Sequence, residues 1–132
     1  PEAWIEEAAE IMLDNGINVL PVIDENRRVI GIITEKDLFK AFLSLTGYRH
    51  QGTRFVIKVE DVPGEFEKVC HLFAAEDANI ENVGVYKSIE RQSEVVIRAT
   101  GEVSVEKMTD VLKSAGFEVV NVWQTKAKDA VN

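Results

Sequence analysis

The hydrophobic residues follow two different patterns along the chain, and the first covers residues 1–46. Between Trp4 and Leu13 apolar residues recur at three- and four-residue spacing, which predicts an amphipathic helix that ends at Asn15-Gly16. Residues 17–23 are almost wholly apolar, which is typical of a strand buried on both faces. A polar turn separates them from a return strand at residues 28–33, in which Gly31 indicates a close backbone approach.

A second helix is expected from Glu35 to about Leu45. Its apolar residues should point inward, and they are Leu38, Phe39, Phe42, Leu43 and Leu45. The order helix-strand-strand-helix gives a small core, so this unit should need a partner surface.

The second pattern begins after a polar, glycine-containing linker at residues 47–53. The expected elements are strands at residues 54–60, 79–87, 93–100 and 117–123, a charged hairpin loop at 88–92, and helices after Gly64 and Ser104, the second ended by Gly116. The β-α-β-β-α-β order predicts a ferredoxin-like, four-stranded antiparallel sheet with both helices on one face. The chain is therefore of the α+β class, with a C-terminal tail at residues 126–132.

The alternation in the first strand of this sheet places Phe55, Ile57 and Val59 toward the helices. Val56 should then face away, and Val96, Val120 and Val122 are expected beside it. A sheet face with several valines is a candidate surface for self-association. The alternative is that residues 1–53 of the same chain cover it.

Composition excludes several classes of protein. Of the 132 residues 45% are hydrophobic, which fits a globular chain, and no apolar run is long enough to span a membrane. The net charge of −8 argues against nucleic acid or an anionic membrane as partner. The single cysteine, Cys70, fits a reducing cytoplasm. The chain does not begin with Met, so further sequence before Pro1 is expected.

No catalytic or metal-binding constellation is recognised. The two histidines are His50 in the linker and His71, which follows Cys70 on a helix. A single Cys–His pair lacks the ligands of a zinc site, and no third group supports a catalytic cysteine. We therefore expect no enzyme activity, no metal and no cofactor.

Thr34 and Asp37 carry the clearest candidate chemistry, because they stand where the second helix begins. The first N–H groups of a helix can hold a phosphate, and a carboxylate one turn later can accept hydrogen bonds from a ribose. The alternative is that both residues only cap the helix.

The runs Ile17–Asp24 and Gly31–Asp37, with Pro-Val-x-Asp followed by Gly-x-x-Thr-x-x-Asp, resemble the CBS motif. CBS motifs usually pair into a Bateman module that binds AMP, ATP or S-adenosylmethionine. The resemblance implies that Thr34 contacts phosphate and Asp37 the ribose. The backbone of Val19, Leu20 and Pro21 would line the adenine pocket. The motif lacks its leading strand and would be the second of a pair, completed by upstream sequence or another subunit.

Residues 54–125 resemble an ACT domain, a small regulatory module that often binds amino acids. The likeness is carried by the element order, by Asp61-x-Pro63-Gly64 after the first strand, and by Asn79-Ile80 opening the second. It implies a ligand at an interface between two domains. The contact positions would be Asp61, Val62, Gly64 and Asn79.

A CBS motif followed by an ACT domain is similar to the acetoin-utilisation regulatory proteins and related CBS–ACT proteins. This resemblance implies a non-catalytic regulator that senses an adenine nucleotide and a small amino acid. The valine-bearing sheet face and the small first unit predict a homodimer or higher homo-oligomer. Two alternatives stay open. The chain could be an oligomerisation or partner-docking module with empty pockets, or the regulatory tail of an enzyme whose catalytic domain lies outside it.

Overall fold

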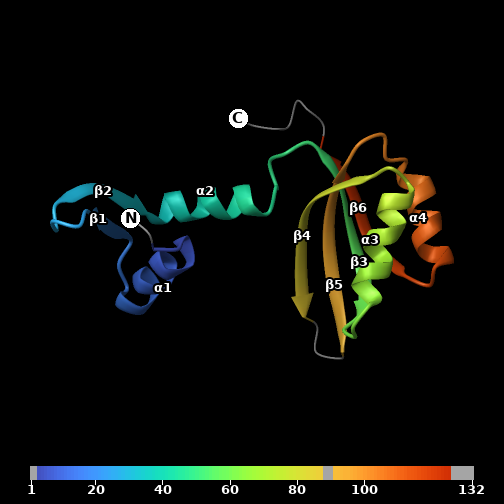
Figure 1. Cartoon of the computed structure of the whole chain (residues 1–132), viewed down its shortest axis with the longest axis horizontal. Coiled ribbons are helices and arrows are strands. Elements are labelled where there is room, and N and C mark those ends of the chain that lie inside the picture. The colour runs from blue at the N-terminus through green and yellow to red at the C-terminus, as the bar shows by residue number, and fades with distance from the viewer. Residues whose placement is uncertain (1–2, 88–90, 126–132) are drawn as a thin grey trace. The chain divides into compact units, whose positions relative to one another are not determined.

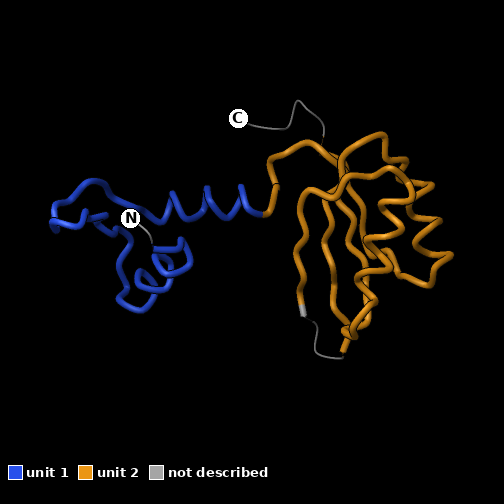
Figure 2. Tube along the Cα trace, viewed as in Figure 1, with its two compact units in different colours: residues 1–45 blue, residues 46–132 orange. Residues whose placement is uncertain are grey.

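The computed structural model describes residues 3–87 and 91–125 and has the expected α+β architecture (Figure 1). Its elements are α1 (Ile5–Asn15), β1 (Val19–Ile23), β2 (Val29–Thr34), α2 (Glu35–Leu45), β3 (Gly52–Glu60), α3 (Glu65–Ala75), β4 (Asn79–Lys87), β5 (Gln92–Thr100), α4 (Val105–Ser114) and β6 (Glu118–Thr125). They form two compact units, residues 1–45 and residues 46–132 (Figure 2). The expected tail at 126–132 and positions 88–90 of the expected hairpin loop lie outside the described residues.

The first unit consists of α1, the antiparallel hairpin β1–β2 and α2. Gly16 ends α1 as predicted, with a φ of 61° that favours glycine. The hairpin turn is held by Asp24, whose Oδ1 accepts the N–H groups of Asn26 at 2.9 Å and Arg28 at 2.8 Å. No backbone of the described residues approaches the position that a Gly31 side chain would occupy: a Cβ there would meet only the Val22 Cβ, at an ordinary 3.9 Å, so the predicted close backbone approach is absent.

The apolar residues of the first unit are far more exposed than the sequence predicted. Val19 and Ile23 of β1 are 45% and 44% exposed, so the strand is not buried on both faces. On α2, Phe39, Phe42 and Leu45 are 65%, 59% and 64% exposed rather than inward. One hairpin and two helices offer too little surface to cover these side chains, which agrees with the expected need for a partner surface.

The second unit is an antiparallel sheet with strand order β4-β5-β3-β6 among the described residues, and α3 and α4 cover one face (Figure 1). Phe55, Ile57 and Val59 are at most 3% exposed and face the helices, as predicted. The rings of Phe55 and Phe73 meet edge to face at 5.3 Å. The strand expected from Arg54 begins earlier, at Gly52.

The predicted helix ends of the second unit are present. Ser104 is the N-cap of α4, and its Oγ accepts the Lys107 N–H at 3.3 Å. Gly116 follows α4 with a φ of 93°, a conformation that favours glycine, and Gly64 precedes α3 with a φ of 92°.

The outer face of the sheet, opposite α3 and α4, carries Val56 and its cross-strand partner Val96 as predicted, but not Val122. The ladder between β3 and β6 shifts register, so that Val56 pairs with Asn121 and Phe55 with Val122. Val122 therefore packs against the core, and Val120 is the extra residue at the shift. A bulge moves every later side chain to the opposite face, which sequence alternation alone does not reveal.

Candidate functional site

Thr34 and Asp37 contact each other where β2 passes into α2. The Thr34 hydroxyl and backbone N–H both donate to Asp37 Oδ2, at 2.7 Å and 3.0 Å, and the Asp37 N–H donates to Thr34 Oγ1 at 3.4 Å. This reciprocal pattern is that of a capping box, with an aspartate in place of glutamate. Both the capping role and a pair of ligand-binding groups are compatible with this geometry.

Hydrogen bonding keeps the Asp37 carboxylate charged. The Thr34 hydroxyl, the Thr34 N–H and the nearby Lys40 ammonium together lower the pKa of Asp37, and the hydroxyl has the largest effect. Lys40 Nζ lies 3.7 Å from Asp37 Oδ1. An ionised carboxylate only accepts hydrogen bonds, which suits it to hydroxyl donors such as those of a ribose.

The other predicted nucleotide contacts lie beside this turn. In the β1–β2 ladder Val19 pairs with Thr34, Leu20 with Ile33 and Pro21 with Ile32. The hairpin thus brings the five predicted residues together at one end of the unit.

A hollow of about 550 Å³ lies between α1 and α2. The described residues that line it are Ala9, Met12, Leu13, Gly16, Ile17, Asn18, Glu35, Leu38 and Phe39, and the five predicted residues are not among them. The hollow adjoins the predicted site through Asn18 and Glu35, since the Glu35 N–H donates to the Asn18 carbonyl at 3.2 Å.

The predicted amino-acid contacts of the second unit are divided between two ends of the sheet. Asp61 follows β3, and its N–H donates to the Arg91 carbonyl, just before β5, at 2.9 Å. Asn79 opens β4 and pairs with Thr100, the last residue of β5. Since a strand rises about 3.3 Å per residue, the length of β5 separates Asp61 from Asn79 by roughly 25–30 Å. One copy of the chain does not bring them into one site.

Val62 and Gly64 stay with Asp61 in the turn before α3. The Val62 side chain is 49% exposed, and a Cβ built on Gly64 would meet no atom within 4 Å. A hollow of about 600 Å³ beside this turn is lined by Gly64, Glu67, Lys68, His71, Leu72, Ala115 and Phe117. The turn therefore presents backbone groups and open space at the start of α3.

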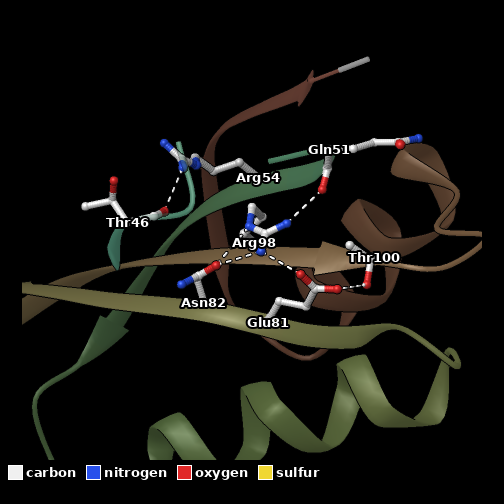
Figure 3. A network of polar contacts seen from close by, with 7 residues as sticks. All are labelled: Thr46, Gln51, Arg54, Glu81, Asn82, Arg98 and Thr100. Atoms are coloured by element: carbon white, nitrogen blue, oxygen red, sulfur yellow. Dashed lines mark hydrogen bonds and ion pairs between the residues drawn. The ribbon is translucent and has the colours of Figure 1, made fainter. Parts of the chain in front are cut away.

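Sequence reasoning missed a buried arginine cluster on β5 (Figure 3). Arg98 is only 4% exposed. Its Nη2 donates to Glu81 Oε2 at 2.6 Å and to Asn82 Oδ1 at 2.7 Å, and its Nη1 donates to the Gln51 carbonyl at 2.7 Å. The other Glu81 oxygen accepts the Thr100 hydroxyl at 2.8 Å. The available signal was an arginine between the apolar residues 97 and 99 of a predicted strand.

A bulge explains how two consecutive residues reach one guanidinium. The β4–β5 ladder pairs Ile80 with Ala99 and Asn82 with Arg98, which leaves Glu81 as the extra residue. The Thr100 hydroxyl, followed by Arg98, lowers the pKa of Glu81, so the pair is ionic.

Arg54 is the cross-strand neighbour of Arg98 in the β3–β5 ladder. Its guanidinium carbon lies 5.5 Å from the centre of the Tyr48 ring and 5.1 Å from that of Trp123. Burial, followed by the charge of Arg98, lowers the pKa of Arg54. Two like charges are thus held side by side by aromatic rings and by acceptors.

A cavity of about 710 Å³ adjoins this cluster at the end of the sheet. Its lining includes His50, Gln51, Glu81, Arg98 and Thr100. Among the residues that the structure describes, no group of three or more His, Cys, Asp and Glu side chains is arranged to hold a metal ion. Across residues 3–87 and 91–125 no helix has the length and apolar character needed to cross a membrane.

Comparison with known proteins assigns a family to each unit. The CBS domain family matches residues 5–44, and the TTHA0829-like ACT domain family matches residues 51–123, more than half of the chain. The first match contains Thr34 and Asp37, and the second contains the Arg98 cluster. Both domains are regulatory modules.

Three relatives are archaeal proteins. An inosine-5'-monophosphate dehydrogenase of Methanocaldococcus jannaschii is 28% identical over 130 residues, which is 89% of this chain and 26% of that protein. An uncharacterised protein of the same organism is 58% identical over 38 residues, 29% of this chain and 14% of that protein. A homoserine O-acetyltransferase of Methanosalsum zhilinae is 54% identical over 37 residues, 28% of this chain and 8% of that enzyme.

The chain spans about a quarter or less of the length of these relatives. The likeness to two enzymes therefore concerns a part of each. With its ACT match covering more than half of its length and a CBS domain ahead of it, the chain belongs to the TTHA0829-like ACT domain family and has the domain arrangement of a CBS–ACT regulatory protein.

Proposed function

We propose that this regulatory module senses an adenine nucleotide (AMP, ATP or S-adenosylmethionine) through its CBS part at residues 1–46. The observation that carries the proposal is the hydrogen-bonded Thr34–Asp37 pair at the start of α2. The first turn of α2 offers backbone N–H groups and a positive dipole end to a phosphate. Val19, Leu20 and Pro21 adjoin this turn in the hairpin and would face the adenine.

Each proposed ligand contact would replace a hydrogen bond that the pair now makes to itself. The Thr34 hydroxyl would donate to phosphate rather than to Asp37, and Asp37 would accept ribose hydroxyls. The ionised state of Asp37 supports this exchange, because hydrogen bonds to a charged acceptor are the stronger ones.

Isothermal titration with AMP, ATP and S-adenosylmethionine tests the proposal. We expect binding of at least one of them, and a loss of about tenfold or more in affinity for Asp37→Asn, which removes a charge-assisted hydrogen bond. Ser104→Ala is the matched control, since it removes the cap of another helix, α4, and should leave binding unchanged. Absence of binding at millimolar ligand, or wild-type affinity in Asp37→Asn, contradicts the proposal.

For the ACT part at residues 54–125, we propose a small amino acid bound between two copies of the chain. Asp61, Val62 and Gly64 of one copy would meet the start of β4, at Asn79, of the other. The distance between the two ends of β5 supports this, because one copy does not assemble the four residues. The Asp61 carboxylate would pair with the ligand amine.

The amino-acid proposal is tested by following backbone amide resonances while single amino acids are added. Binding should shift the amides of Val62, Gly64 and Asn79 together, and Asp61→Ala should abolish the shifts. A response at Val62 and Gly64 without one at Asn79 would contradict the interface site. A Ser104→Ala control should respond as wild type does.

We also propose assembly as a homodimer or larger homo-oligomer. β4 is an edge strand, and its Val83, Val85 and Tyr86 are 43%, 57% and 57% exposed. The exposed apolar residues of α2 support the same conclusion.

The free thiol of Cys70, the single cysteine, supports a cytoplasmic location.

A second candidate is that the chain regulates an enzyme to which it is joined. The observation in its favour is the likeness to parts of an inosine-5'-monophosphate dehydrogenase and a homoserine O-acetyltransferase. Reading the coding sequence on both sides of this chain decides the matter. A catalytic domain in the same reading frame would support this candidate, and stop codons on both sides would eliminate it.

A further inference from the structure

Residues 46–51 lie against the outer face of the ACT sheet, and we call them the strap. The sequence predicts a polar linker at residues 47–53, but two arginines of the sheet bind the strap backbone (Figure 3). Arg54 Nη2 donates to the Thr46 carbonyl at 3.0 Å, and Arg98 Nη1 donates to the Gln51 carbonyl at 2.7 Å. Both ends of the strap are therefore attached.

The middle of the strap is shaped to fit the sheet. Gly47 is buried and has a φ of 61°. A Cβ at this position would collide with Asn82 Oδ1 and with Arg98 Nε, so any larger residue would displace the strap or these two side chains. The His50 N–H donates to the Gly47 carbonyl at 3.1 Å, which closes the strap into a turn.

Arg98 makes release of the strap costly. Its guanidinium carries five N–H donors and is only 4% exposed, so these donors need acceptors inside the protein. Asn82 and Glu81 satisfy Nε and Nη2, whereas the Gln51 carbonyl of the strap accepts from Nη1. Departure of the strap would leave part of a buried cation without its acceptor.

We infer that Arg98 is a positioning residue that holds the strap on the ACT sheet, where Gly47 fits against the Asn82 and Arg98 side chains. The connection between the two modules is therefore an ordered part of the ACT unit. The polar groups of the cluster hydrogen-bond to one another, which favours a structural role over a ligand site in the adjoining cavity. We call this attachment of the strap by Arg98 the clasp. Through Glu81 and Asn82 the clasp ties the strap to the beginning of β4. The inference goes beyond the proposed function, because it concerns how the modules are joined and holds whether or not either binds a ligand.

Hydrogen exchange of the whole chain tests the clasp. In the wild type the His50 amide should be protected, because it is bonded to the Gly47 carbonyl. Gly47→Ala keeps Arg98, Glu81 and Asn82 in the sequence, but its Cβ would collide with the Asn82 and Arg98 side chains and so displace the strap. It should raise His50 exchange by about tenfold or more, while the amides of Phe55 and Ile57 in β3 stay protected.

Gly16→Ala is the matched control. Gly16 has the same φ of 61°, and a Cβ there would meet nothing within 4 Å, so the backbone strain is equal and the collision is absent. In Gly16→Ala the amides of the strap should exchange as they do in the wild type.

Arg98→Gln gives a second perturbation, in which His50 should again lose protection. Trypsin supplies an independent readout, because the exposed Arg49 lies within the strap and cleavage after it should accelerate in Arg98→Gln and Gly47→Ala. Three results would overturn the inference. They are an unprotected His50 amide in the wild type, equal strap exchange in Gly47→Ala and Gly16→Ala, or a rise in the exchange of the β3 amides as large as that of His50, which would indicate global unfolding.

Discussion

Identical side chains have opposite roles at Ser93 and Ser104. Ser93 is 4% exposed, and its Oγ has no hydrogen-bond partner among the described residues. Ser104 is exposed, but its Oγ accepts the Lys107 N–H and caps α4. A desolvated hydroxyl without a partner is unfavourable, whereas a cap is worth about 1 kcal/mol.

The two serine-to-alanine changes should therefore differ in sign. We expect Ser93→Ala to raise the free energy of unfolding by up to about 1 kcal/mol and Ser104→Ala to lower it by about 1 kcal/mol. Urea unfolding followed by circular dichroism measures both. Destabilisation by Ser93→Ala equal to that by Ser104→Ala would show that the Ser93 hydroxyl is hydrogen-bonded.

The Glu81 carboxylate makes stability depend on pH. Its pKa in the folded chain is lowered from the ordinary value of 4.5, chiefly by the Thr100 hydroxyl and then by Arg98. A lowered folded pKa adds stability that is fully present above the unfolded pKa and is lost as pH falls through the folded one. The stability gap between wild type and Glu81→Gln should be widest near neutral pH and should narrow below about pH 4.5.

Unfolding in urea at several pH values measures this gap. Thr100→Val is an internal check, because removing the hydroxyl should move the Glu81 pKa upward in a carbon-detected titration. A gap that stays constant down to pH values below the folded pKa would rule out the ionic pair as its origin.

Among the elements, local chemistry predicted most boundaries, whereas the errors concern which side chains are buried and how the strands pair. Gly16, Pro63-Gly64, Ser104 and Gly116 act on their own turn of chain, and the helix ends lie beside them. Which side chains of a strand face the core, and which residues they pair with, depends on the partner strand. The extra residue at Glu81 brings it and Asn82 to Arg98, and no pattern within β4 predicts this. Likewise, exposure of β1 and α2 reflects surfaces that the first unit lacks.

The bulge in β6 yields a test on two valines of one strand. Val122 packs against the core beside Phe55, whereas Val120 is 46% exposed at the register shift. Val122→Ala should cost about 1–2 kcal/mol, from roughly 0.8 kcal/mol per buried methylene, and Val120→Ala less than about 0.5 kcal/mol. Equal losses in urea unfolding would mean that β6 pairs with β3 without the shift.

At the scale of the whole molecule, each unit leaves apolar surface uncovered. Phe39 and Phe42 of α2 are more than half exposed, and Val85 on the edge strand β4 is 57% exposed. Stable dimers of globular proteins bury about 800 Å² on each partner, and exposed apolar residues of this kind are typical of such surfaces. We therefore expect both units to contribute to the proposed assembly.

Sedimentation velocity of the chain should accordingly give a dimer or larger species. A charge placed on a contact surface would have to be desolvated when two copies associate. Phe39→Asp should therefore weaken assembly through α2, and Val85→Asp should weaken assembly through β4. Asn121→Asp places the same charge at an exposed position on the outer face of β6 and should leave the sedimentation coefficient unchanged. A monomeric wild type would refute assembly and, with it, an amino-acid site that draws Asp61 and Asn79 from different copies. If Asn121→Asp dissociates the assembly and Phe39→Asp and Val85→Asp do not, the interface lies on the outer face of the sheet.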